Sequence, residues 1–309
     1  MKTLVLSLLA SAGLATAAPA GDFGPLVTPR DLQSAVAGPD APLVLDIRGD
    51  AYAQGHVAGA VPAPYPLFRG PAENPGALVP EDRLQATLRD LGVTLERPVV
   101  VVHQGEDDSD FGSAARVYWT LKSSGVSHLA ILNGGMNAWA AEGLPLETAA
   151  NRPQPSEVEI SFSDRWLATT GDVGAIVEGK EKARLLDSRP AAFYEGRQSH
   201  AAAAKPGTLP GAENVPHAVW FSSPTQVMDA PSAADVAAKL GIGKDEEVVA
   251  FCNTGHWAAT EWFALSELAG LEDVKLYPDS MVGWSQSGGR MENTPGLLRN
   301  LVGQFRGGN

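Results

Sequence analysis

A single cysteine, Cys252, lies between two segments of different character. The apolar run Val248–Phe251 precedes it and is typical of a buried parallel strand. A short loop containing Gly255 follows, and then a segment with the apolar spacing of a helix. Cys252 is therefore expected at the carboxyl edge of a sheet, where open α/β folds bind ligands. A thiol facing loop amides and a helix N-terminus is expected to ionise readily and to act as a nucleophile.

The residues after Cys252 suggest how negative charge on sulfur could be stabilised. The amides of Asn253 to Ala258 are expected to point inward, and Gly255 lets the loop curl. His256 either supplies positive charge below its reference pKa of about 6.5, or donates a hydrogen bond to a substrate oxygen, or only packs and caps the loop. Trp257 either walls the pocket or packs under the helix. Thr254 either bonds sulfur or caps the helix.

Length and charge narrow the classes of function. The chain has 309 residues, a length typical of two domains, and a net charge of −13. Its pI of about 4.9 argues against nucleic acid or an anionic membrane as a partner. An anionic substrate would need local positive potential to be held by such a protein.

The N-terminus has the pattern of a signal peptide, assigned to residues 1–20. Lys2 precedes an apolar core at residues 4–10, and small residues follow up to Ala20. The core is too short to span a membrane, and cleavage is expected after Ala18 or Ala20. The alternative is a disordered or anchored N-terminus. An exported, periplasmic protein with one cysteine has no internal disulfide, so its thiol is expected to be buried or functional.

The order of elements occurs twice along the chain. Strands alternate with helices, which indicates parallel sheets with helices on both faces. A strand ending in Asp46 and Arg48 corresponds to one ending in Asp187 and Arg189. We therefore expect two copies of one α/β domain, over residues 22–149 and 158–305, joined by a polar linker at residues 150–157.

These repeated motifs resemble the tandem-domain rhodanese (sulfurtransferase) family. The Asp-x-Arg strand ends occur in both copies. The His-Ile-Pro-Gly-Ala-x-Asn element of the family resembles residues 56–60 and 208–214, and its Cys-x-x-Gly loop matches Cys252–Gly255. The resemblance covers nearly everything after the leader. It implies two domains with central parallel sheets, of which only the second carries a working cysteine.

The first copy is expected to be inactive. It has no cysteine, and Gln104 aligns with the cysteine position. Carboxylates crowd the loop that follows, so it would repel an anion and is expected to be solvated and structural. A calcium site built from Asp107, Asp108 and Asp110 is only weakly indicated, because the spacing of an EF-hand is absent.

The resemblance implies ping-pong sulfur transfer from thiosulfate or a similar donor, through a Cys252 persulfide, to a thiol, a dithiol protein or cyanide. It implies no metal and no other cofactor. The predicted substrate-binding residues are Asn253, Thr254, Gly255, His256, Trp257, Ala258 and Arg197. The predicted structural residues are Asp46, Arg48, Asp187 and Arg189.

Other functions remain as alternatives. Related phosphatases use Cys-(x)5-Arg, but no arginine occurs from Cys252 to Thr260, which argues against phosphate chemistry. Relatives that use 3-mercaptopyruvate carry an arginine shortly after the Asp-x-Arg strand, and here the next one is Arg197. The uncharged loop also allows a non-catalytic persulfide or selenium carrier, or a module that binds a partner protein.

Overall fold

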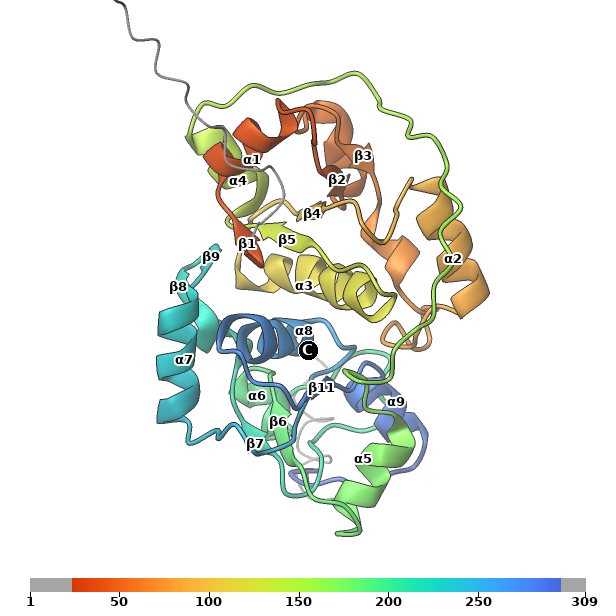
Figure 1. Ribbon diagram of the computed structural model, residues 1–309. Coiled ribbons are helices and arrows are strands. Elements are labelled where there is room, and N and C mark those ends of the chain that lie inside the picture. The colour runs from red at the N-terminus through yellow and green to blue at the C-terminus, as the bar shows by residue number, and fades with distance from the viewer. Residues whose placement is uncertain (1–23, 296–309) are drawn as a thin grey trace, which may run out of the picture.

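Two parallel sheets, one in each half of the chain, form the framework of the molecule (Figure 1). The computed structural model describes residues 24–295, so the predicted leader lies outside the described residues. The first sheet has the order β1-β5-β4-β2-β3, and all its strand pairs are parallel. Its strands are β1 (Leu26–Val27), β2 (Leu43–Asp46), β3 (Val61–Pro62), β4 (Val99–Val102) and β5 (Leu129–Leu132).

The second sheet repeats the plan with the order β11-β10-β6-β7, again parallel throughout. Its strands are β6 (Arg184–Asp187), β7 (Glu213–Asn214), β10 (Val248–Phe251) and β11 (Val274–Leu276). A small antiparallel pair, β8 (Phe221–Ser223) and β9 (Gln226–Val227), extends from this half toward the first. The predicted fold of two α/β domains with central parallel sheets is confirmed.

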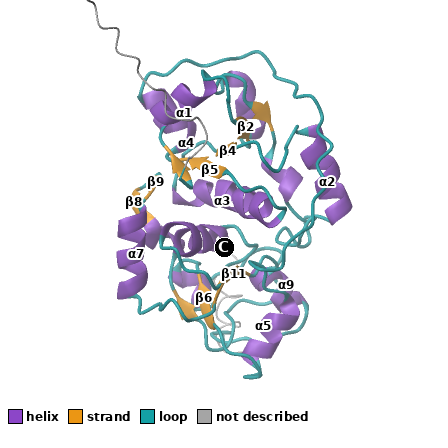
Figure 2. Ribbon diagram, in the orientation of Figure 1, coloured by secondary structure: helices purple, strands orange, loops and turns teal. Residues whose placement is uncertain are grey.

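Helices cover both faces of each sheet (Figure 2). Those of the first half are α1 (Pro29–Val36), α2 (Glu81–Asp90), α3 (Asp108–Ser123) and α4 (Gly135–Ala141). Those of the second half are α5 (Thr170–Val177), α6 (Ala191–Tyr194), α7 (Ala230–Lys239), α8 (Trp257–Trp262) and α9 (Ser280–Gln286). Short 3₁₀ helices occupy Gly49–Gln54, Tyr65–Phe68 and His217–Trp220, and α8 continues as a π-helical turn over Phe263–Leu268. None of the helices within residues 24–295 has the length and apolar character needed to cross a bilayer.

The strands alternate their side chains between two cores, as a period of two requires. In the first sheet, Val44 and Val100 pack against α1 and α4, whereas Leu45 and Val101 face α2 and α3. Every residue of β2, β4, β5 and β10 is buried, which explains why the sequences of these strands are apolar except for Asp46 at the end of β2.

Helices α3 and α8 meet between the two sheets (Figure 1). Phe263, just after α8, packs edge-on against Phe111 and Tyr118 of α3, with ring centroids 5.5 and 5.1 Å apart. The Tyr118 hydroxyl also donates to Glu267 at 2.8 Å. One apolar core continues across this junction. The helix that follows Cys252 is therefore held by the first domain as well as by its own.

The segment between the domains runs along the first domain. Residues 151–163 contain no helix or strand. Ser156 N donates to Arg89 O at 2.9 Å, and Arg89 Nε donates to Val158 O at 2.8 Å. Val158 and Ile160 are buried in the core shared with α2 and α3. The linker therefore packs on the first domain for several residues beyond the predicted end at residue 157.

Candidate active site

Cys252 directly follows β10 and lies at the carboxyl edge of the second sheet, before α8. Cys252 is 1% exposed, so the groups packed around its sulfur determine how it reacts. Gly255 has φ +64°, a left-handed conformation that turns the chain back toward the cysteine. The backbone N–H of His256 then points at the Cys252 Sγ, with N···S 3.3 Å. Such a donor stabilises negative charge on sulfur.

Ser280, at the start of α9, holds both ends of the cysteine turn. Its Oγ accepts hydrogen bonds from Cys252 N at 3.0 Å and from Gly255 N at 3.1 Å. The same hydroxyl donates to Tyr277 O at 2.8 Å. Ser280 is fully buried and has φ +50°, an uncommon conformation for a residue with a side chain. These bonds engage the amides of Cys252 and Gly255, so neither amide faces the sulfur. Within residues 24–295, the His256 N–H is the amide that is hydrogen-bonded to the sulfur.

Asn253 contacts the arginine of the Asp-x-Arg strand end rather than the open side of the loop. Arg189 Nη1 donates to Asn253 Oδ1 at 3.2 Å, and its Nε and Nη2 form a fork on Asp187 at 2.8 and 2.6 Å. Thr208, which replaces the histidine of the family element, donates to Asp187 Oδ2 at 2.7 Å. Asp187 and Arg189 are both buried, so this geometry is that of a structural pair.

The first domain repeats this arrangement and shows which residue corresponds to Cys252. Arg48 forms the same fork on Asp46, and its Nη1 donates to Gln104 Oε1 at 3.1 Å. Gln104 thus corresponds to Asn253, and His103 corresponds to Cys252. Strand register agrees, because Asp46 pairs with the last residue of β4 as Asp187 pairs with the last residue of β10. The sequence alignment of Gln104 with the cysteine was wrong by one residue.

His256 is fixed by the first domain through both ring nitrogens. Its Nε2 lies 2.7 Å from Ser109 O, and its Nδ1 lies 3.0 Å from Tyr65 Oη. A carbonyl only accepts, so Nε2 carries the proton and Nδ1 accepts from the Tyr65 hydroxyl. Burial, and then the charge of Arg69, lower the pKa of His256 to about 4. The ring is therefore neutral at ordinary pH, which favours the packing alternative over a positively charged one.

Trp257 also bonds to the first domain. Its Nε1 donates to Ser109 Oγ at 2.8 Å, and its ring stacks on His217 at 5.0 Å with an interplanar angle of 4°. Burial is the main cause that lowers the pKa of His217, which favours the uncharged ring in this stack. Trp257 therefore lies between the two domains, packed on one side and hydrogen-bonded on the other.

Positive charge reaches the loop from the first domain. Arg116 of α3 is 1% exposed, and its Nη1 donates to Gly255 O at 3.3 Å. Burial, and then the charge of Arg69, lower the pKa of Arg116 to about 9, so it remains a cation at neutral pH. Arg69 lies over the Tyr65 ring at 5.2 Å, and its Nη1 is buried with no hydrogen-bond partner in the described residues. Burial raises the pKa of Tyr65, and negative charge on Cys252 adds a smaller upward contribution to the pKa of Tyr65 and of Arg116.

The remaining predicted substrate residues make no hydrogen bond to the sulfur in the described part of the chain. Thr254 and Ala258 are buried in the loop. Arg197 pairs with Glu195 at 2.6 Å, where both side chains are at least half exposed. Within residues 252–258, His256 is therefore the residue that contacts the sulfur through a hydrogen bond, whereas Arg197 is neutralised at the surface.

The carboxylates of the first copy are used within their own loop. Asp107 caps α3 by accepting from Asp110 N at 2.8 Å. Asp110 accepts from His103 Nδ1 at 2.9 Å and from Gly105 N. Burial raises the pKa of Asp110, but the hydrogen bonds from His103, Gly105 and Glu106 outweigh it and lower the pKa overall. No cluster of three or more metal-ligating side chains occurs between residues 24 and 295.

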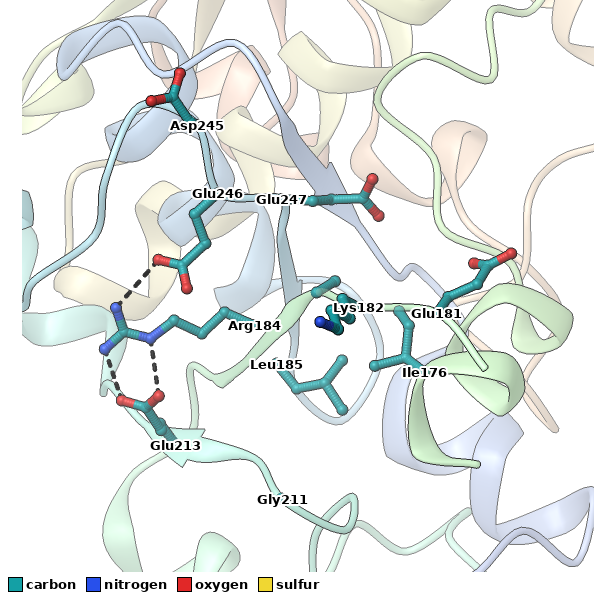
Figure 3. Close-up of a pocket in the computed structure, with 11 residues that line it drawn as sticks. Ile176, Glu181, Lys182, Arg184, Leu185, Gly211, Glu213, Asp245, Glu246 and Glu247 are labelled. Carbon is teal, nitrogen blue, oxygen red and sulfur yellow. Dashed lines mark hydrogen bonds and ion pairs between the residues drawn. The ribbon is translucent and has the colours of Figure 1, made fainter. Parts of the chain in front are cut away.

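A large cavity lies away from the cysteine (Figure 3). It has about 760 Å³ and is lined at the amino-terminal ends of β6 and β10, whereas Cys252 lies at the carboxyl end. Arg184 in its wall is already paired with Glu213 and Glu246, at 2.7 and 3.5 Å. The cavity is therefore not part of the cysteine site: it lies at the opposite edge of the sheet, and the arginine in its wall is already paired with carboxylates.

Sequence reasoning did not identify five residues of the site: Tyr65, Arg69, Ser109, Arg116 and Ser280. The first four come from the other domain, so no local spacing to Cys252 marks them. Ser280 lies 28 residues after Cys252, and no motif in the sequence singles out its hydroxyl. A search for basic residues in the inactive copy would have found Arg69 and Arg116, but only as members of a longer set.

The fold and the site together define a class: a duplicated α/β protein with one nucleophilic cysteine in the second copy. The rhodanese-like domain model matches residues 28–142 and 170–287. The chain belongs to the rhodanese family and is a sulfurtransferase.

Relatives support this assignment. Thiosulfate sulfurtransferase of Azotobacter vinelandii is 32% identical over 277 residues, which cover 85% of this chain and 96% of that protein. Sulfur carrier protein TtuD of Thermus thermophilus is 28% identical over 253 residues, 78% of this chain and 87% of that protein. The crystal structure of SseA from Escherichia coli, described as a 3-mercaptopyruvate sulfotransferase, has the same fold, with a TM-score of 0.72 and 24% identity. That match covers 84% of this chain and 99% of the SseA chain.

Proposed function

We propose that this sulfurtransferase takes sulfane sulfur from thiosulfate, or a similarly small anion, as a persulfide on Cys252. The observation that carries the proposal is the pair Arg69 and Arg116 beside the cysteine loop. Neither forms an ion pair with a carboxylate within residues 24–295, and Arg69 has a buried nitrogen with no partner. In a protein of net charge −13, such a pair favours binding of a doubly charged anion.

The first half-reaction needs no proton. The Cys252 thiolate attacks the outer sulfur of thiosulfate and forms a new S–S bond, while the bond to the sulfonate sulfur breaks. Sulfite leaves with the electron pair, and the total charge is unchanged. The His256 N–H stabilises the sulfur that it faces, and Arg116 and Arg69 stabilise the departing anion.

The second half-reaction returns the cysteine to its thiolate. Cyanide, or the thiolate of a small thiol or dithiol protein, attacks the outer persulfide sulfur, and Cys252 leaves with the electron pair. Cys252 is 1% exposed, so the outer sulfur is the atom within reach of an acceptor. We propose that the reaction occurs after export to the periplasm, without nucleic acid, membrane or a metal cofactor as partner.

Thiosulfate is favoured over 3-mercaptopyruvate by the state of Arg197. This arginine is the candidate for binding the carboxylate of 3-mercaptopyruvate, but it is paired with Glu195 at the surface. We expect kcat/KM with cyanide as acceptor to be higher for thiosulfate than for 3-mercaptopyruvate. A higher value for 3-mercaptopyruvate would refute the proposed donor but leave the sulfurtransferase assignment intact.

A carrier function is the second candidate, because one relative is named a sulfur carrier protein and the cysteine here is buried. Steady-state kinetics separate the two. An enzyme gives a saturable rate and parallel double-reciprocal lines when thiosulfate and cyanide are varied. A carrier accepts one sulfur per chain and shows no sustained turnover with cyanide.

A further inference from the structure

In the inactive domain, helix α3 and the 3₁₀ helix Tyr65–Phe68 form a site that holds His256 of the catalytic loop. Three residues contact the His256 side chain: Tyr65 donates to Nδ1, Ser109 accepts from Nε2, and Gly112 lies against the ring. We call Tyr65, Ser109 and Gly112 the His256 seat. All three belong to the domain that lacks a cysteine.

Gly112 shows how closely the ring fits. A Cβ at this position would lie 2.9 Å from His256 Cδ2, 2.9 Å from His256 O and 3.0 Å from Nε2. Glycine costs an α-helix about 1 kcal/mol relative to alanine. Here, at a helical position of α3, its lack of a side chain lets the imidazole and its backbone approach the helix.

His256 itself connects the seat to the sulfur. The His256 backbone N–H donates to Cys252 Sγ at 3.3 Å, while the His256 ring is held by Tyr65 and Ser109. The next residue is tied to the seat as well, because Trp257 Nε1 donates to Ser109 Oγ. The contacts that hold the His256 ring therefore also help to hold the backbone amide that faces the sulfur.

We propose that the His256 seat positions the catalytic loop, so that the inactive domain sets the reactivity of Cys252. Its residues are positioning residues, since none of them forms a hydrogen bond to the sulfur in the described part of the chain. The inference rests on Cys252 being the nucleophile of the proposed function, but it does not depend on which donor is used.

The test compares Tyr65→Phe, Ser109→Ala and Gly112→Ala with Ser127→Ala in the full-length protein. Ser127 is exposed, and within residues 24–295 its hydroxyl bonds only Leu95 O, so this control loses a hydroxyl of the same domain away from the seat. Two rates are measured: persulfide formation from thiosulfate in a single turnover, and alkylation of Cys252 by iodoacetamide across pH. Thermal unfolding reports folding separately.

Tyr65→Phe removes the hydrogen bond to His256 Nδ1, whereas Ser109→Ala removes the bond from Trp257 Nε1 and keeps the backbone carbonyl that accepts from His256 Nε2. We expect each variant to slow both rates by about fivefold, the effect of one hydrogen bond. Gly112→Ala should slow them by about tenfold or more, because a misplaced group costs more than a lost bond. The KM for thiosulfate should change little, since the seat does not bind the donor. The pH midpoint of alkylation should rise in the seat variants and stay unchanged in Ser127→Ala.

A double-mutant cycle makes the test specific. In His256→Leu, a side chain of similar size has no polar atom, so nothing replaces Nδ1 as an acceptor for Tyr65. Adding Tyr65→Phe to this variant should then have no further effect. Seat variants that fold normally and show wild-type rates would overturn the proposal. A wild-type protein that takes no sulfur from thiosulfate would refute the proposed donor instead, and alkylation would still report on the seat.

Discussion

Arg116, from a helix of the cysteine-free domain, donates a hydrogen bond to the carbonyl oxygen of Gly255 in the cysteine loop of the other domain, with Nη1···O 3.3 Å. The same guanidinium donates to Gly76 O at 2.9 Å. A fixed cation therefore lies behind a loop whose own residues, from Cys252 to Thr260, include no arginine or lysine. Positive charge therefore reaches this loop from the other domain and not from the loop's own residues.

Arg69 is the cation that we propose to bind the donor, because its Nη1 is buried with no hydrogen-bond partner within residues 24–295. We expect Arg69→Ala to lower kcat/KM for thiosulfate by about 10- to 100-fold, the range of one charge-assisted hydrogen bond to an anion. Arg30→Ala is the matched control, since Arg30 is a surface arginine paired with Glu142. Equal kcat/KM values for Arg69→Ala, the control and the wild type would contradict the role of Arg69.

Gly255 has two reasons to be glycine, and they can be separated. Its φ is +64°, and a Cβ would lie 2.5 Å from Arg116 Nη1 and 2.7 Å from Pro278 O. Gly241 has φ +68°, and a Cβ there would meet no other atom within 4 Å. Gly241→Ala should therefore cost only the left-handed backbone, about 1 kcal/mol of unfolding free energy.

Gly255→Ala should cost more than Gly241→Ala, by roughly 1–3 kcal/mol for overpacking, and should also slow sulfur loading. Urea denaturation measures the first effect and single-turnover loading the second. Equal stabilities of the two variants would mean that Arg116 and the Pro278 backbone leave room for a Cβ at position 255.

The protonation of His256 gives a prediction for acid pH. Its pKa in the folded protein is about 4, lowered chiefly by burial, against about 6.5 in the unfolded chain. The neutral ring therefore contributes stability that is fully present above pH 6.5 and is lost as the pH falls toward 4. Nitrogen-15 NMR of the imidazole should show the Nε2–H tautomer throughout pH 5–7. A titration of His256 near pH 6.5 would contradict this environment.

Glu261 on α8 makes the stability of the protein depend on pH in the opposite direction, between about pH 4.3 and 8. It is fully buried, and neither carboxyl oxygen has a hydrogen-bond partner in the described residues. Burial raises its pKa to about 8, and its polar neighbours Trp220 and Ser188 lower it only in part. The folded state thus holds a proton that the unfolded state loses above about pH 4.3. Stability from this group is full below that value and is lost as the pH rises to 8.

Glu261→Gln should remove this loss. We expect the variant to gain on the order of a few kcal/mol of unfolding free energy over the wild type at pH 8, and little at pH 4.5. Urea denaturation at the two pH values measures the difference. A gain that is the same at both pH values would show that Glu261 does not titrate as a buried acid.

Much of the fold could be predicted because the signals are local. The apolar runs of β2, β4, β5 and β10 are buried on both faces, and such runs read as parallel strands. The start of α1 was equally local: Thr28 Oγ1 accepts from Asp31 N, with Pro29 in the first turn. The repeat of these elements then implied two domains.

The site was only half predictable, for a physical reason. Cys252 and Gly255 act within one turn of chain, so their spacing carries the signal. Arg69 and Tyr65 reach the loop because α3 packs on α8, a contact that no short-range pattern encodes. The register error at His103 has a similar origin: strand pairing, not the motif alone, fixes which residue follows the strand.

The most direct test of sulfur transfer is the mass of Cys252 after exposure to a donor. Wild-type protein incubated with thiosulfate and freed of excess reagent should gain one sulfur atom on the peptide that contains Cys252, and cyanide should remove it as thiocyanate. Cys252→Ser should neither gain the atom nor transfer sulfur to cyanide. Full transfer by Cys252→Ser, or sulfur bound elsewhere in the wild type, would contradict a mechanism centred on this thiol.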